Sequence, residues 1–206
     1  MKLALIGGGG HCRSCIDVAR SAGLPLGGIV DPADRAKILD LPRLGDDAWL
    51  DMPEARAFQY LVTVGQIDAS AVRRRLFDYV RERKLDCATV IAASAIVSTE
   101  AALGAGTIVM HRAFINAGAT VGANCIVNTG AIVEHDVWIG DHCHVSTGAI
   151  VNGGATIGEG CMIGSGAIVL QGVTVAAGAV VGAGAVVAKN IEKAGTWIGV
   201  PARKTT

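Results

Sequence analysis

The sequence predicts a small α/β domain followed by a parallel β-solenoid, and three observations support this prediction. Charged side chains concentrate at the front of the chain, where residues 1–94 carry 25 of the 36 charges and residues 95–190 carry only 7. The front part alternates short apolar runs with longer amphipathic segments, which is typical of α/β domains. The later part repeats an aliphatic residue every six positions, which is typical of hexapeptide solenoids.

Length and composition exclude several classes of protein. The chain has 206 residues and 51% hydrophobic content, enough for a substantial core. Its 18 basic and 18 acidic side chains exclude a general nucleic-acid binder, which needs a basic excess. The apolar run before the first glycine is too short for a secretory signal. Six cysteines without an export signal fit a reducing compartment, so we expect a cytoplasmic protein.

The front of the chain predicts a small Rossmann-like sheet. Strands are expected over residues 2–6, 28–30 and 60–64, and helices over 12–22 and 68–84. This alternation predicts a parallel sheet in a domain spanning residues 1–90. Four glycines precede His11 between the first strand and the first helix, so backbone N–H groups can approach a phosphate there. Asp31, after the second strand, can accept a hydrogen bond from a ribose hydroxyl.

The later part divides without a gap into sixteen hexads, from Ala95 to Asn190. The third position is aliphatic in every hexad: Val97, Leu103, Val109, Ile115, Val121, Val127, Val133, Ile139, Val145, Val151, Ile157, Ile163, Val169, Val175, Val181 and Val187. A helix would place residues six apart on opposite faces, which excludes helical structure. A strand that turns every six residues keeps the first and third positions inward. We therefore expect a solenoid over 95–190 and a tail over 191–206.

The same spacing bears on membrane insertion. Residues 113–133 and 160–188 carry no charge and are long enough to cross a bilayer. Their apolar residues recur with the hexad period and are interrupted by glycines, so they do not fill a membrane-spanning window. We expect no insertion into a membrane.

One cluster of charges interrupts the apolar repeat at Glu134, His135 and Asp136. His135 occupies a fifth hexad position, which lies at a corner between strands. An acidic neighbour can orient the imidazole ring and raise its basicity, as a general base requires. Solvated corner residues of a purely structural solenoid would show the same pattern, and the spacing alone does not separate the two interpretations.

Both halves together resemble the bacterial hexapeptide-repeat nucleotide-sugar acetyltransferases, the sialic-acid O-acetyltransferase-like group that includes amino-sugar N-acetyltransferases. The matching segments are residues 7–11, Asp31, Gly65 with a following arginine, residues 128–136, His144 and residues 199–203. The resemblance implies a left-handed parallel β-helix with three hexads in each coil. It also implies a homotrimer that binds acetyl-CoA between neighbouring solenoids. Outward residues such as Trp138 and Ile126 are expected to be poorly covered in a single chain, which favours assembly.

The coil length that the resemblance implies relates residues 18 apart. Cys125, Cys143 and Cys161 would stack inward as small buried hydrophobes, which is a commoner role than a metal or redox site. Gly153 would lie one coil after His135, where its N–H can bind a developing oxyanion.

The resemblance also implies roles for individual residues. His135 resembles the catalytic base, and Asp136 resembles the acidic residue that raises its basicity. Gly153 completes the catalytic group. The residues expected to hold acetyl-CoA are His144, Gly153, Ser165 and Ala183. The residues expected to hold the nucleotide sugar are Gly9, Gly10, His11, Asp31 and Gly65. No metal is expected.

The expected activity is acetyl-CoA-dependent N-acetylation of a nucleotide-linked amino sugar, a precursor of a glycan or surface polysaccharide. Two alternatives stay open at this point. O-acetylation of a sialic-acid-like sugar or of serine would use the same base. A non-catalytic hexapeptide scaffold would share the solenoid, although the His–Asp pair and the glycine loop argue against it.

Overall fold

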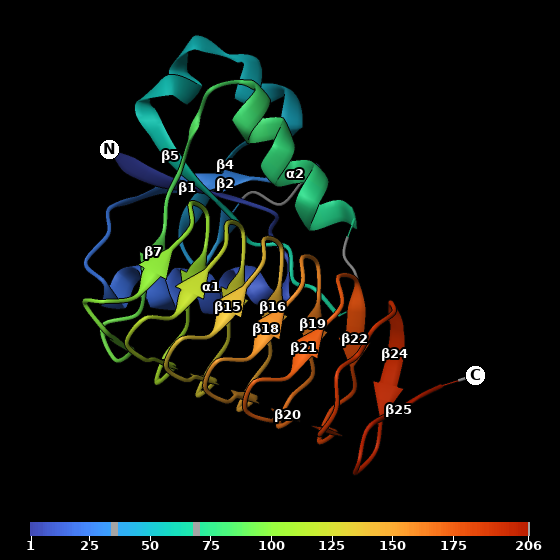
Figure 1. Ribbon diagram of the computed structural model, residues 1–206. Coiled ribbons are helices and arrows are strands. Elements are labelled where there is room, and N and C mark those ends of the chain that lie inside the picture. Colours follow the sequence, from blue (N-terminus) through green and yellow to red (C-terminus); the bar gives the residue numbers. More distant parts are fainter. Residues whose placement is uncertain (34–36, 68–70, 206) are drawn as a thin grey trace.

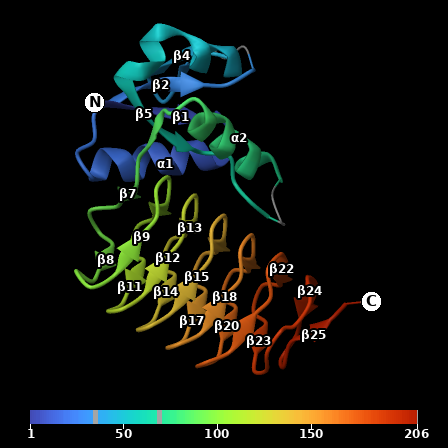
Figure 2. The same cartoon turned by 45° about the horizontal axis from the view of Figure 1, so that its top comes forward.

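The computed structural model describes residues 1–33, 37–67 and 71–205, and it shows an N-terminal α/β unit packed on a long solenoid (Figures 1 and 2). The N-terminal sheet has the strand order β3-β4-β2-β1-β5-β6. Its strands are β1 (Lys2–Ile6), β2 (Leu26–Val30), β3 (Lys37–Ile38), β4 (Leu41–Gly45), β5 (Phe58–Val62) and β6 (Asp86–Cys87). The pairings are parallel except in the β3–β4 hairpin. The predicted parallel sheet is confirmed.

Two α-helices and two 3₁₀ helices complete this unit: α1 (Gly10–Ser21), α2 (Ala71–Glu82), η1 (Asp47–Asp51) and η2 (Pro53–Ala57). Helix α1 begins two residues earlier than expected, because extended backbone at Gly9 already serves as its N-cap. Helix α2 ends two residues earlier than expected, and residues 68–70 of that prediction lie outside the described part of the chain. Neither α-helix is long and apolar enough to cross a bilayer, and the described residues hold no other helix that is.

The solenoid has three parallel faces. The first face holds β7 (Val90–Ile91), β10 (Ile108–Val109), β13 (Ile126–Val127), β16 (His144–Val145), β19 (Met162–Ile163), β22 (Ala179–Val181) and β24 (Gly195–Ile198), with β25 (Arg203–Lys204) paired antiparallel at its end. The second face holds β8 (Ile96–Val97), β11 (Phe114–Ile115), β14 (Ile132–Val133), β17 (Ile150–Val151), β20 (Ile168–Val169) and β23 (Val186–Val187). The third holds β9 (Ala102–Leu103), β12 (Thr120–Val121), β15 (Trp138–Ile139), β18 (Thr156–Ile157) and β21 (Thr174–Val175).

The register of these strands gives the length of a coil. Ile132 pairs with Ile150, and Ile150 pairs with Ile168, so each coil takes 18 residues. Strand β7 already pairs with β10, so the first strand of the solenoid precedes the sixteen hexads found in the sequence.

The hexad pattern fills the interior. Third positions are buried throughout except at Val97 and Leu103, which are half-buried in the first coil, at the open end of the solenoid. Each fully buried aliphatic side chain stabilises the fold by roughly 1.5–3 kcal/mol. Cys125, Cys143 and Cys161 stack inside the coils with at most 1% exposure, and the Cys143 N–H donates to Cys125 Sγ at 3.4 Å.

The N-terminal unit covers part of the first face (Figures 1 and 2). Cys12, Cys15 and Ile16 of α1 share one buried apolar cluster with Ile108 and Ile126. The prediction that Ile126 would be poorly covered is wrong, because α1 leaves it fully buried, whereas Trp138 is 48% exposed. The Cys12-x-x-Cys15 pair faces this core, and burial raises the pKa of Cys15 to about 12.

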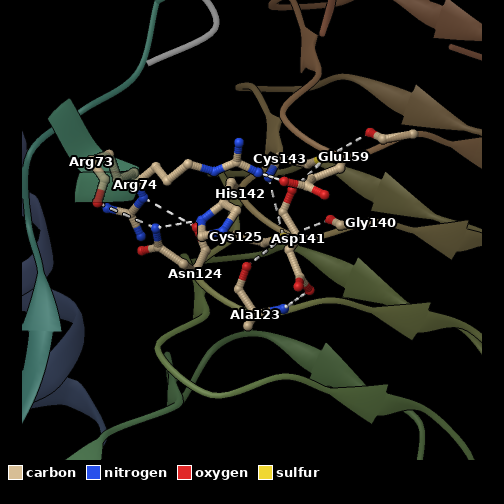
Figure 3. A network of polar contacts seen from close by, with 11 residues as sticks. Arg73, Arg74, Ala123, Asn124, Cys125, Gly140, Asp141, His142, Cys143 and Glu159 are labelled. Carbon is tan, nitrogen blue, oxygen red and sulfur yellow. Dashed lines mark hydrogen bonds and ion pairs between the residues drawn. The ribbon is translucent and has the colours of Figure 1, made fainter. Parts of the chain in front are cut away.

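Helix α2 is fastened to the corner between the third and first faces by a polar network (Figure 3). The buried Arg73 donates from Nε to the Asn124 carbonyl at 3.2 Å and from Nη1 to the Val62 and Val64 carbonyls at 2.6 and 3.1 Å. Arg74 forms an ion pair with Glu159 two coils further along. Arg73 therefore holds both the end of β5 and the solenoid.

Candidate active site

His135 and Asp136 lie at the corner between the second and third faces. His135 Nδ1 is 3.0 Å from Asp136 Oδ2, and both side chains are exposed. Because a carboxylate only accepts hydrogen bonds, the proton of a neutral ring sits on Nδ1 and leaves Nε2 unprotonated. This is the tautomer in which Nε2 can act as a general base.

Two glycines make room for this pair. A Cβ on Gly153 would lie 2.6 Å from His135 Nε2, so only glycine lets the imidazole lie across that part of the backbone. A Cβ on Gly118, one coil before Asp136, would lie 2.5 Å from Asp136 Oδ1. The Gly153 N–H donates to no acceptor among the described residues. The Gly153 backbone therefore lies against the ring with an unused N–H group, and its contact with an oxyanion stays a prediction.

Glu134 does not point freely into solvent. Its Oε2 accepts from Asn116 Nδ2 at 2.7 Å and from the His135 N–H at 3.3 Å. The sequence did not predict the role of Asn116. Asn116 lies one coil before Glu134, and the hexad period alone does not give the length of a coil. The pair fixes the backbone that carries His135.

A second site lies in the N-terminal unit, in a cavity of about 360 Å³ at the carboxyl ends of β1, β2 and β5. The predicted residues Gly9, Gly10, His11, Asp31 and Gly65 all line it. Asp47 and Arg75 also line it and were not predicted, although Arg75 belongs to the one basic run in the sequence. The Asp31 carboxylate accepts from the Gly8 N–H and from the Ala33 N–H at 2.7 Å, so it also shapes the loop.

The glycine loop offers open space and a neutral histidine. A Cβ on Gly9 or Gly10 would meet nothing within 4 Å, whereas one on Gly65 would lie 3.5 Å from His11 Cβ. Burial lowers the pKa of His11 to about 4, and the charge of Arg73 adds to this effect. His11 is therefore uncharged at neutral pH. Its buried Nε2 has no hydrogen-bond partner among the described residues and is free for a ligand.

His144 lies on the first face, in β16, and is only 7% exposed. Its Nδ1 donates to the Gln66 carbonyl at 2.7 Å, and its Nε2 accepts from Asn128 Nδ2 at 3.0 Å. Burial lowers the pKa of His144, although the bond to Gln66 opposes this. The sequence predicts that His144 contacts acetyl-CoA, whereas the structure covers it with the loop after β5. Its contact with acetyl-CoA stays a prediction.

Ser165 and Ala183 are exposed at the corner between the first and second faces, 18 residues apart. Neither of their N–H groups donates to an acceptor among the described residues. Small side chains and unused donors in a column fit the carbonyls of a pantetheine arm. The described residues hold no group of three or more potential metal ligands.

The predicted site residues therefore fall into separate places. The first face carries the N-terminal unit with its cavity, while His135 lies at the corner opposite that face. Ser165 and Ala183 occupy another corner. One chain does not bring its own His135 and its own cavity together.

Two family descriptions match the chain. Residues 2–80 match the PglD N-terminal domain, and residues 154–189 match the bacterial transferase hexapeptide (six repeats). No curated protein matches significantly. These matches agree with the N-terminal parallel sheet and the left-handed β-helix that the sequence predicted.

Solved structures resemble the chain over its full length. The acetyltransferase domain of PglB from Neisseria gonorrhoeae FA1090 is 32% identical, with 99% of each chain covered and a TM-score of 0.94. A histidine-to-asparagine mutant of perosamine N-acetyltransferase from Caulobacter crescentus, solved with CoA and GDP-perosamine, is 36% identical. That match covers 100% of this chain and 97% of the other, with a TM-score of 0.93. WeeI from Acinetobacter baumannii AYE, at 22% identity and a TM-score of 0.88, shares the fold.

Proposed function

The chain belongs to the hexapeptide-repeat nucleotide-sugar acetyltransferases, and from this premise we propose that it moves the acetyl group of acetyl-CoA to the amino group of a nucleotide-linked amino sugar. The observation that carries the proposal is the His135–Asp136 pair, whose unprotonated Nε2 lies over Gly153. The similarity to an enzyme solved with GDP-perosamine favours a GDP-linked amino sugar as acceptor, and a UDP-linked sugar stays open.

Each residue at the His135 corner has its own role in the proposed reaction. His135 Nε2 takes the proton of the amine as the amine nitrogen attacks the thioester carbonyl. The Gly153 N–H donates to the oxygen on which negative charge develops. Asp136 holds the ring and stabilises the imidazolium that forms. The proton on His135 then neutralises the leaving thiolate, so coenzyme A departs as a thiol.

In this proposal each of the two domains binds a different substrate. We assign the nucleotide sugar to residues 1–90 and acetyl-CoA to residues 95–190, with the tail over 191–206 next to the last coils. Gly9, Gly10, His11, Asp31 and Gly65 would hold the nucleotide, and Arg75 supplies positive charge for its phosphates. Ser165 and Ala183 would hold the pantetheine arm. Holding both substrates in fixed positions makes the transfer effectively unimolecular.

The separate positions of the two sites support an active site that is shared with a second copy of the chain. The outward positions of the second face form an unbroken apolar column: Ile96, Phe114, Ile132, Ile150, Ile168 and Val186. Packing these columns around a common axis would bring the His135 corner of one copy to the Ser165 corner of the next. Such a contact joins two different surfaces, and contacts of this kind close into rings. We propose a cyclic homotrimer with active sites between copies.

The cysteines also suggest a compartment. The six cysteines are free, which suits the reducing conditions of the cytoplasm. We propose a cytoplasmic location.

The assembly can be tested on the second face. Ile150→Glu would place a charge in the proposed contact, which costs several kcal/mol when the charge has no partner. We expect light scattering to show a monomer and acetyl transfer to be lost. Thr174→Glu, on the third face, is the matched control and should leave the trimer intact. A monomer with full activity would contradict the shared site.

The activity can be tested by following thiol release from acetyl-CoA with a panel of UDP- and GDP-amino sugars. We expect turnover with at least one amino sugar and an N-acetyl product by mass spectrometry. No turnover with the matching hydroxyl sugar is expected. Transfer to hydroxyl acceptors alone would instead support O-acetylation.

Gly9→Val tests the acceptor cavity in the same assay. A Cβ at this position would meet nothing within 4 Å, and Gly9 has a φ of −76°, so we expect the fold to tolerate valine. The side chain would fill space meant for the nucleotide. We expect the KM for the acceptor to rise at least about tenfold, which is about 1.4 kcal/mol, while the KM for acetyl-CoA stays unchanged. A rise in the KM for acetyl-CoA instead would reverse the assignment of the two sites.

A further inference from the structure

A second set of polar contacts joins the two domains, and it involves none of the residues assigned a role above. Ser94 precedes β8, His111 lies one coil further along, and Asp17 belongs to α1. Ser94 Oγ is 2.8 Å from His111 Nδ1, and His111 Nε2 is 3.1 Å from Asp17 Oδ2. The three side chains come from separate parts of the sequence, and the expected acetyl transfer uses none of them.

The hydrogen-bond directions in this group follow from its chemistry. The Asp17 carboxylate only accepts, so the proton of the neutral His111 ring lies on Nε2. His111 Nδ1 is then free to accept the hydroxyl proton of Ser94. An acid that fixes the tautomer and a histidine that acts as base on a serine are the roles of a nucleophilic triad, which is recognised by geometry and not by sequence order.

The backbone around Ser94 is held in place while the residue itself is open to solvent. The Ala93 N–H donates to Ser21 Oγ at 3.2 Å, and the Ala95 N–H donates to the Ala92 carbonyl at 2.9 Å. The Ser94 N–H donates to no acceptor among the described residues. Ser94 is exposed in the first coil, at the end of the solenoid that no further coil covers. A nucleophile and a free donor for an oxyanion therefore belong to the same residue.

We propose that Ser94 is an activated nucleophile that accepts acyl groups from small activated esters and thioesters. Ser94 Oγ attacks the acyl carbon while His111 Nδ1 takes the hydroxyl proton. The bond from the acyl carbon to the alcohol or thiol breaks, and His111 returns the proton to that leaving group. The product is an acyl ester of Ser94, and attack by water on this ester releases the carboxylic acid and restores the hydroxyl.

The test uses p-nitrophenyl acetate as donor and the full chain as enzyme. We expect release of p-nitrophenol together with an acetyl group on the peptide that contains Ser94, found by mass spectrometry after an acid quench. Ser94→Ala should abolish this adduct. His111→Gln should slow acylation by about 10²-fold or more, the size of a general-base contribution, and Asp17→Asn should slow it less.

The controls separate this site from other serines and from the proposed function. Ser98 lies in the same coil, and its Oγ accepts from the Glu100 N–H with no histidine beside it, so Ser98→Ala should change nothing. His135→Ala should keep the ester reaction, and Ser94→Ala should keep acetyl transfer to an amino sugar. Equal acetylation of Ser94 in wild type and His111→Gln, or no adduct on Ser94 at all, would overturn the proposal.

Discussion

Replacing His135 by alanine is expected to lower kcat for acetyl transfer by about 10²–10⁴, the range found for loss of a general base. The imidazole is exposed and only covers Gly153, so its removal should leave the fold and nucleotide binding intact. Thiol release gives the rate, and isothermal titration with the free nucleoside diphosphate checks the binding site.

Asp136→Asn provides the graded control. The amide can still bond His135 Nδ1, but it removes the charge that stabilises the imidazolium, so a smaller loss of kcat is expected. Activity near the wild-type level in His135→Ala would contradict the mechanism. In that case His144, which bonds to the loop after β5, would be the next residue to test.

Combining two impaired variants in one trimer is expected to restore activity when the acceptor concentration is well below its KM. His135→Ala lacks the base but keeps the nucleotide cavity, whereas Gly9→Val keeps the base but has a filled cavity. If each site takes His135 from one copy and the cavity from the next, every cyclic trimer that holds both variants has one complete site out of three. The recovered rate of the doubly tagged protein should therefore be about a third of the wild-type rate.

The experiment needs exchange between copies, so the two variants are co-expressed with different tags and purified through both. The two proteins purified separately and mixed without exchange serve as the control and should show only the low residual activity of the two variants. No recovery in the doubly tagged protein would show that each chain supplies both halves of its own site, against the opposite placement of His135 and the cavity.

Much of the fold follows from local pattern in the sequence. The hexad rule places an aliphatic residue inward at every turn, and burial of these residues drives the coil. The glycine loop and Asp31 follow two parallel strands, whose carboxyl ends meet at one edge of a sheet. Helix ends were less predictable, because capping at Gly9 depends on backbone conformation and not on residue type alone.

The His135–Asp136 pair could also be read from the sequence, because adjacent residues at a corner meet whatever the rest of the chain does. Asn116, Gly118 and Arg75 could not. Asn116 and Gly118 meet their partners across one coil, and Arg75 reaches the cavity only through the packing of α2.

The sequence by itself determined the two kinds of domain, the inward residues and the candidate base, since these depend on interactions within a few residues. The tertiary structure alone decided that α1 buries Ile126, that His144 bonds to the loop after β5, and that Ser94, His111 and Asp17 meet. It also placed His135 opposite the acceptor cavity. These contacts join residues far apart in the chain, and they form because packing one apolar face of the N-terminal unit on the solenoid fixes every polar group around that interface.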